Sequence, residues 1–181
     1  MNVYGTIKGK LMIIKDPKHI ENIKTRKPTL VKNFHQLKGD FTWLSKLLDS
    51  HEHYAMLCKS RIFDLYGIWQ IRGLNNINTF MEYYTFFQRL FNYVSHPDDN
   101  SDLFISLVSN LGTPHVDKED VHLLGLYGNT TYQIFLGGSV RQEFTISPGD
   151  YLFIPHGQKH RVFSKTPRII LSIGFFGEMK C

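Results

Sequence analysis

The chain contains little cysteine and no long apolar run. Its 181 residues include only two cysteines, Cys58 and Cys181. Two cysteines so far apart can form neither a disulfide framework nor a zinc knuckle. Cys58 has no neighbouring signature of a reactive thiol, so we interpret it as an ordinary buried residue. Residues 11–14, an aliphatic run near the start, are too few for a membrane span or a signal-peptide core. We therefore expect no membrane association and a cytoplasmic location.

The sequence also lacks repeats, low-complexity segments and a recognisable linker. Hydrophobic residues make up 42% of the chain and aromatic residues 14%, which excludes an intrinsically disordered protein and the compositions of collagen and coiled coils. A chain of this length can bury roughly 70% of its unfolded surface, so its core needs no disulfide or structural metal. We predict a single domain over residues 1–181, with helical and strand additions over about 1–100 and a barrel core over about 101–177.

Positive charge is concentrated at the start of the chain. Residues 1–38 hold nine of the 21 Lys and Arg residues but only two of the 16 acidic residues, Asp16 and Glu21. A basic segment of this kind can attract RNA, ribosomes or acidic peptides. No stacking motif or recognition helix accompanies it, so a solvated, lysine-rich surface is the simpler interpretation.

Helical periodicity marks two segments in the first hundred residues. Residues 41–48 follow Asp40 and place their apolar side chains on one face of a short helix. A longer helix is predicted from Thr79, which forms a capping box with Glu82, to a point before Pro97. Its apolar stripe consists of Phe80, Tyr84, Phe87, Phe91 and Val94. We interpret this stripe as core rather than as a ligand-stacking surface.

After residue 100 the pattern changes to short strands separated by turns roughly every ten residues. The predicted strands are 102–108, 121–127, 131–136, 140–146, 151–155, 161–164 and 168–176, with an earlier one at 29–32. Gly128-Asn129 reads as a hairpin turn, and Pro148-Gly149 fits the two central positions of a type II turn. The pattern favours a β-sandwich or a closed barrel.

The segment from Gly112 to Asp117 carries the most informative motif. In an extended strand, residues two apart point to the same face, so His115 and Asp117 can both project into a barrel. A third ligand is expected from a neighbouring strand. His160 is the candidate, because the glycines and proline of residues 149–157 supply the turns that return the chain. Two imidazoles and one carboxylate suit Fe(II) and leave three coordination positions open.

These motifs resemble the cupin-like, JmjC-type Fe(II)/2-oxoglutarate oxygenases, which include ribosomal oxygenases and an asparaginyl hydroxylase. Residues 26–34 are similar to the opening strand of the family, and Trp43 lies on a helix that follows it. Residues 113–128 resemble the metal strand, and residues 147–160 and 171–175 resemble the closing half. The resemblance covers most of the chain.

The resemblance implies a mainly β fold, a double-stranded β-helix (cupin or jelly-roll barrel) with flanking N-terminal helices. It further implies that His115, Asp117 and His160 hold Fe(II) as catalytic residues, and that 2-oxoglutarate and dioxygen are cosubstrates. The implied activity is hydroxylation of a protein or peptide side chain, with ribosomal and nucleic-acid-associated proteins as candidate substrates.

One position departs from the family. A Lys or Arg normally lies two residues after the glycine of the first hairpin and binds the distal carboxylate of 2-oxoglutarate, but this chain has Thr130 there. Arg168 is the expected replacement. It lies eight residues after His160 on the last predicted strand, where the related prolyl-hydroxylase-type oxygenases place their carboxylate-binding Arg, and a guanidinium can hold a carboxylate through two hydrogen bonds. The hydroxyls of Thr113 and Thr130 would add hydrogen bonds. The competing interpretation places Arg168 at the surface.

Two other functions remain open at this point. Thr130 favours a metal-binding cupin that does not use 2-oxoglutarate, such as a small-molecule dioxygenase, an isomerase or a storage protein. A degenerate scaffold that acts as a binding module is the other, and three convergent ligands argue against it.

The remaining histidines and two aromatic residues carry weaker signals. His156 lies in a turn and should point away from the metal, while His122 is expected to pack. His51 and His53 could bind metal adventitiously. Core packing is the simpler role for both Trp69 and Tyr132, with pocket lining as the alternative.

Overall fold

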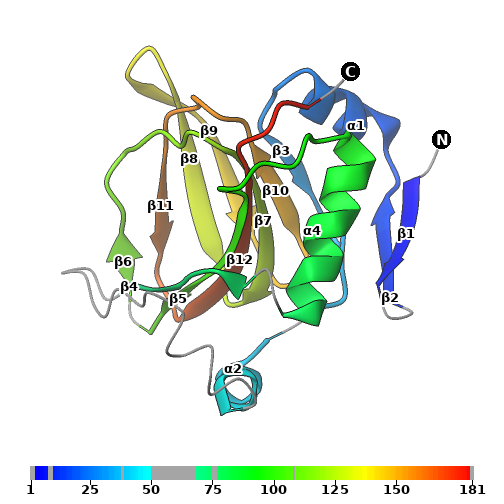
Figure 1. The fold of residues 1–181 in the computed structure, drawn as a ribbon. Coiled ribbons are helices and arrows are strands. Elements are labelled where there is room, and N and C mark those ends of the chain that lie inside the picture. Colours follow the sequence, from blue (N-terminus) through cyan, green and yellow to red (C-terminus); the bar gives the residue numbers. More distant parts are fainter. Residues whose placement is uncertain are drawn as a thin grey trace.

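Two antiparallel sheets form the body of the molecule (Figure 1). The computed structural model describes residues 3–7, 10–37, 39–49, 68–74, 77–107 and 109–179. The larger sheet contains, in spatial order, β3 (Thr29–Val31), β10 (Tyr151–Ile154), β7 (Asp120–Tyr127), β12 (Arg168–Phe175), β5 (Asn100–Ser106) and β4 (Ile68–Ile71). The smaller sheet contains β6 (Asn110–Leu111), β11 (His160–Ser164), β8 (Thr130–Leu136) and β9 (Ser139–Ile146).

The chain passes back and forth between these sheets from β5 onward. β5, β7, β10 and β12 belong to the larger sheet, whereas β6, β8, β9 and β11 belong to the smaller one. Leu123 of β7 and Tyr132 of β8 belong to one buried cluster, which shows that the two sheets face each other. The predicted mainly β jelly-roll fold, a double-stranded β-helix, is therefore confirmed.

The eight strands predicted as residue ranges are all present, with ends displaced by at most two residues. The turn residues between short apolar runs located them well, because β7, β10 and β12 are buried along almost their whole length and end where the chain turns. The type II turn is also confirmed: Gly149 has φ +96°, and the Asp150 N–H donates to the Ser147 carbonyl at 3.0 Å.

The hairpin predicted at Gly128-Asn129 is wrong. β7 and β8 lie in different sheets, so this turn carries the chain across the sandwich instead of joining paired strands. Apolar alternation reveals a strand but does not identify its partner. Gly128 is nevertheless required, because its φ is +65° and a Cβ there would lie 2.0 Å from the Pro167 carbonyl oxygen.

We expect Gly128→Ala to destabilise the fold by about 1–3 kcal/mol more than Gly137→Ala, because it adds a steric collision. Gly137 is a matched control, since its φ is +57° but its Cβ would meet nothing within 4 Å. Both variants carry the cost of a left-handed residue. Urea unfolding measures the difference, and equal midpoints would show that the approach to Pro167 imposes no constraint.

Helix α4 (Asn78–Phe91) packs on the larger sheet, on the side away from β8 and β9 (Figure 1). Its buried side chains are Phe80, Tyr83, Phe87 and Phe91. The predicted capping box is wrong: the helix begins one residue before Thr79, and its N-cap, Ile77, makes no side-chain cap bond. The helix ends at a left-handed Asn92, so Val94 lies beyond it and is exposed.

Several elements before residue 100 were not predicted. They are the strands β1 (Val3–Ile7), β2 (Lys10–Ile14) and β4, and the helix α1 (Pro17–Lys24). The predicted short helix is present as α2 (Phe41–Asp49), and the Asp40 carboxylate accepts a hydrogen bond from the Trp43 N–H at 2.7 Å. Cys58, His51 and His53 lie outside the described residues. Within the described ranges no helix combines the length and apolarity needed to cross a membrane.

Two cations of the basic segment are engaged within the protein. Lys32 pairs with Asp150 at 2.7 Å, and Arg26 pairs with Asp120. Part of the positive charge of residues 1–38 is therefore neutralised within the folded chain.

Candidate metal centre

His115, Asp117 and His160 come together at one end of the sandwich. His160 is the first residue of β11, whereas His115 and Asp117 lie in the connection between β6 and β7. The extended strand assumed for His115 and Asp117 is not formed: His115 makes only an isolated bridge, donating its N–H to the His160 carbonyl at 2.8 Å and accepting the His160 N–H at 2.9 Å. This bridge places the two imidazole rings 4.4 Å apart.

The three side chains present their ligand atoms to one point. Nε2 of His115 lies 3.7 Å from Oδ1 of Asp117, and Nε2 of His160 lies 3.4 Å from Oδ2 of Asp117. All three ligand atoms are within 4.8 Å of one another. The triad predicted from sequence is thus assembled, with the ligand types that suit a non-haem iron site.

The tautomers of both histidines fit a metal. Nδ1 of His115 donates to the Thr113 carbonyl at 2.9 Å, and Nδ1 of His160 donates to the Gln158 carbonyl at 3.0 Å. A carbonyl can only accept, so each ring carries its proton on Nδ1 and leaves the Nε2 lone pair facing Asp117. Backbone carbonyls commonly orient metal-ligating histidines in this way.

The ligands differ in their exposure to solvent. The His160 side chain is 5% exposed, compared with 45% for His115. Burial lowers the pKa of His160, whereas the Asp117 carboxylate raises it. The protein therefore favours a neutral His160, the form that binds a metal.

A cavity of about 660 Å³ extends from the triad into the sandwich. Polar groups from two strands line its inner part, namely Tyr132 of β8 and Arg168 and Ser172 of β12. Apolar walls come from Phe104, Val121, Leu123 and Val162. A cavity of this size with convergent polar groups is typical of a small-molecule site.

Arg168 is buried, contrary to the surface interpretation. It is 1% exposed at the start of β12 and donates a hydrogen bond to the Tyr132 hydroxyl. Burial lowers its pKa and raises the pKa of Tyr132 to about 12. The Tyr132 ring lies 6.3 Å from the His160 ring, so Tyr132 connects the arginine to the metal end of the cavity.

The two threonines occupy different environments. Thr113 is exposed and lines the cavity beside His115. Thr130 is fully buried, and its Oγ1 makes no hydrogen bond with the described part of the chain. Thr130 is two residues from Tyr132 on β8, so both face the interior of the sandwich, but Tyr132 lines the cavity and Thr130 does not.

His156 and His122 lie away from the triad. The His156 ring approaches the Asp120 carboxylate at 3.4 Å, which agrees with the expectation that it points elsewhere. His122 is fully buried, as expected, but it also makes hydrogen bonds through both ring nitrogens, to Tyr93 and Tyr151. The Trp69 side chain is outside what the structure describes.

Two acidic residues of the cavity were missed from the sequence. Asp102 is 6% exposed and accepts a hydrogen bond from the Gln70 amide at 2.9 Å, while Glu119 is half-buried. Burial raises the pKa of both carboxyl groups, and Asp117 raises that of Glu119 further. The spacing of Asp102 and Phe104 on β5 is the signal that could have placed Asp102 in the cavity.

No protein-family model matches the chain, and no curated protein matches its sequence. Solved structures do match. The ribosomal oxygenase YcfD of Escherichia coli aligns with a TM-score of 0.63 and 17% identity, over 92% of this chain and 52% of YcfD. YcfD in complex with cobalt and 2-oxoglutarate aligns with a TM-score of 0.62 and 18% identity, over 88% of this chain and 50% of YcfD. The chain thus spans about half the length of these proteins, and its fold is that of the cupin-like oxygenases its motifs resemble.

Proposed function

We propose that this protein is an Fe(II)- and 2-oxoglutarate-dependent oxygenase that hydroxylates a protein side chain. The observation that carries the proposal is the convergence of His115, Asp117 and His160 at a cavity that also holds the buried cation of Arg168. A metal triad and a buried cation in one cavity match the two ends of 2-oxoglutarate, which chelates through one end and carries a carboxylate at the other.

The proposed roles follow from the donor groups. The two Nε2 atoms and the Asp117 carboxylate would hold Fe(II) as a facial triad. Bound Fe(II), with 2-oxoglutarate and dioxygen, supplies chemistry that couples decarboxylation to succinate with hydroxylation of a C–H bond. The protein holds the ligands in the metal-binding tautomers and excludes water with the apolar cavity walls.

Arg168 would anchor the distal carboxylate of 2-oxoglutarate. Its guanidinium keeps its charge when buried and can donate two parallel hydrogen bonds to a carboxylate. Tyr132, which accepts from Arg168, would fix the orientation of that group. Thr113, which lines the cavity beside His115, would add a hydrogen bond near the metal end of the cosubstrate. The hydroxyl of Thr130 would add another if the cosubstrate reaches beyond Tyr132, because Thr130 faces the same interior.

The substrate is proposed to be a protein or peptide, with ribosomal proteins as candidates. The support is the fold shared with a ribosomal oxygenase and the exposure of His115 at the cavity entrance. An exposed metal ligand leaves space for a substrate side chain to reach the site from solvent. This assignment would also place the protein in the cytoplasm, with ribosomes.

One observation favours the second candidate, a metal-binding cupin that does not use 2-oxoglutarate. The position that normally holds the basic residue is Thr130, which is buried and brings no charge. The two candidates differ in whether they release succinate. The oxygenase should form succinate from 2-oxoglutarate when Fe(II) and oxygen are present, and a peptide substrate should increase the rate. Metal binding without succinate formation under any of these conditions would favour the second candidate.

A further inference from the structure

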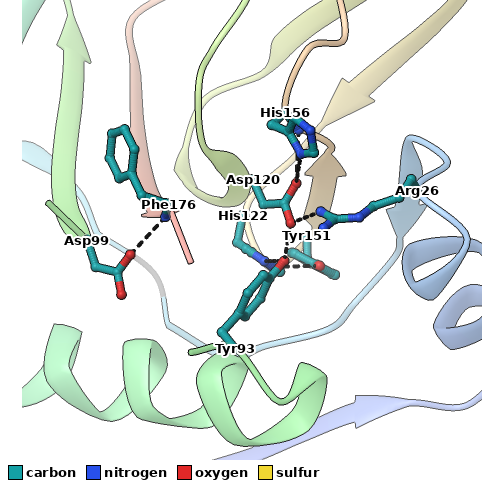
Figure 2. Close-up of polar contacts among 8 residues, drawn as sticks. All are labelled: Arg26, Tyr93, Asp99, Asp120, His122, Tyr151, His156 and Phe176. Carbon is teal, nitrogen blue, oxygen red and sulfur yellow. Dashed lines mark hydrogen bonds and ion pairs between the residues drawn. The ribbon is translucent and has the colours of Figure 1, made fainter. Parts of the chain in front are cut away.

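A buried polar cluster lies between β7 and the segments that cover the larger sheet (Figure 2). Its centre is Asp120, which is 2% exposed on its side chain and forms an ion pair with Arg26. The Asp120 carboxylate also accepts the Tyr93 hydroxyl at 2.9 Å and the backbone N–H of His156 at 2.9 Å. Asp120 does not line the cavity, so the chemistry described above makes no direct use of it.

The protons of this cluster all point toward Asp120. Tyr93 donates its single proton to the carboxylate, so at the 3.0 Å contact with His122 the Nε2 atom must be the donor. Burial lowers the pKa of His122, and a neutral ring with its proton on Nε2 leaves Nδ1 to accept from the Tyr151 hydroxyl at 2.9 Å. The result is a directed chain that ends on a fully engaged carboxylate, an arrangement that fixes the position of Asp120.

The turn held by Asp120 contacts both metal-ligand segments. His156 donates its backbone N–H to Asp120. The next residue, Gly157, donates its N–H to the Asp117 carbonyl at 3.0 Å. Gln158 then supplies the carbonyl that accepts from Nδ1 of His160. Residues 156–158 thus connect Asp120 to the backbone of Asp117 and to the ring of His160.

We propose that Asp120 is a positioning residue for the metal site. By holding the turn at residues 155–158, its carboxylate sets the place of the Asp117 backbone and the rotation of the His160 ring. Arg26 acts through Asp120, and its backbone adopts a left-handed φ of +60° where its side chain makes this contact. The inference rests on the proposed metal site, because it concerns the alignment of the same ligands.

The test is Co(II) binding by the intact protein, followed through its visible ligand-field spectrum. Asp120→Asn is expected to weaken Co(II) affinity by roughly 10-fold or more, the usual effect of losing a group that supports a ligand, and to change the spectrum. Asp150→Asn is the matched control. Asp150 is also buried, pairs with Lys32 and accepts two backbone N–H groups, from Asn33 and Ser147, but its turn does not contact the triad. It should lower stability and leave affinity and spectrum unchanged.

A second variant keeps the test decisive if Asp120→Asn does not fold. Arg26→Gln changes a side chain that is 33% exposed, and it should weaken Co(II) binding in the same direction by a smaller factor. In the double variant the loss should equal that of Asp120→Asn alone, because Arg26 acts through the carboxylate.

Two results would overturn the inference, and they are distinguishable. If the wild type binds Co(II) while a folded Asp120→Asn or Arg26→Gln variant shows unchanged affinity and spectrum, the positioning role is wrong and the metal site stands. If the wild type binds Co(II) no better than His160→Ala, the metal site itself is wrong, and the role of Asp120 falls with it.

Discussion

His160→Ala should abolish tight Fe(II) binding and leave the fold intact. The Nε2 atom of His160 lies 3.4 Å from the Asp117 carboxylate, so its loss leaves two ligands of three. The effect should exceed the roughly 10–100-fold that follows when only a hydrogen-bonding partner of a ligand is removed. His115→Ala and Asp117→Ala should have the same result. Anaerobic titration measures the affinity, and circular dichroism checks the fold.

His156→Ala is the control for this prediction. His156 lies in the turn just before His160, but its ring faces Asp120. Its backbone N–H, which alanine keeps, makes the shorter of its two contacts with Asp120. Its effect on metal affinity should be small. Loss of metal in His156→Ala with normal binding in His160→Ala would show that the ligands have been assigned to the wrong residues.

Arg168→Ala should raise the concentration of 2-oxoglutarate required for half-maximal succinate release, with Fe(II) affinity nearly unchanged. Truncating one partner of a buried, hydrogen-bonded charge pair costs on the order of 2–5 kcal/mol, which is at least about a tenfold weakening. Arg168→Lys should recover only part of the loss, because a point charge replaces a two-pronged donor. Unchanged half-saturation in Arg168→Ala would contradict the anchor assignment.

Two further variants sharpen the Arg168 experiment. Arg161→Ala removes a cation of β11, in the smaller sheet, that contacts Gln133 and does not line the cavity, so it should leave the 2-oxoglutarate requirement unchanged. Thr130→Lys in the Arg168→Ala background should restore binding in part, because it returns a cation to the strand where the family carries one. Thr130 and Tyr132 face the same interior, and Tyr132 contacts Arg168.

The metal triad was predictable because its signal is local. His115 and Asp117 are two residues apart. The turn residues around Gly157 predicted that the chain reverses before His160. The three side chains converge as expected although His115 and Asp117 do not lie in an extended strand. An isolated bridge between His115 and His160, with two backbone hydrogen bonds, was enough to align the rings.

The parts of the site that escaped sequence analysis depend on contacts between distant residues. Arg26 and Asp120 are 94 positions apart, and nothing in either segment indicates the other. The crossing at Gly128 was missed for a similar reason, because a turn between two apolar strands has the same pattern whether or not the strands pair. Arg168 was singled out by a different route, from its position relative to His160 in related oxygenases and from the need of a buried anion for a cation. The structure places it buried in the cavity wall, and its anchor role stays a prediction.

The most direct test of the account is anaerobic titration of the wild-type protein with Fe(II), with and without 2-oxoglutarate. We predict one equivalent of bound iron and a visible metal-to-ligand charge-transfer band that develops only when both are present, and that is absent in His160→Ala. Iron binding without the band at any 2-oxoglutarate concentration would contradict the oxygenase assignment and favour a cupin that does not use this cosubstrate.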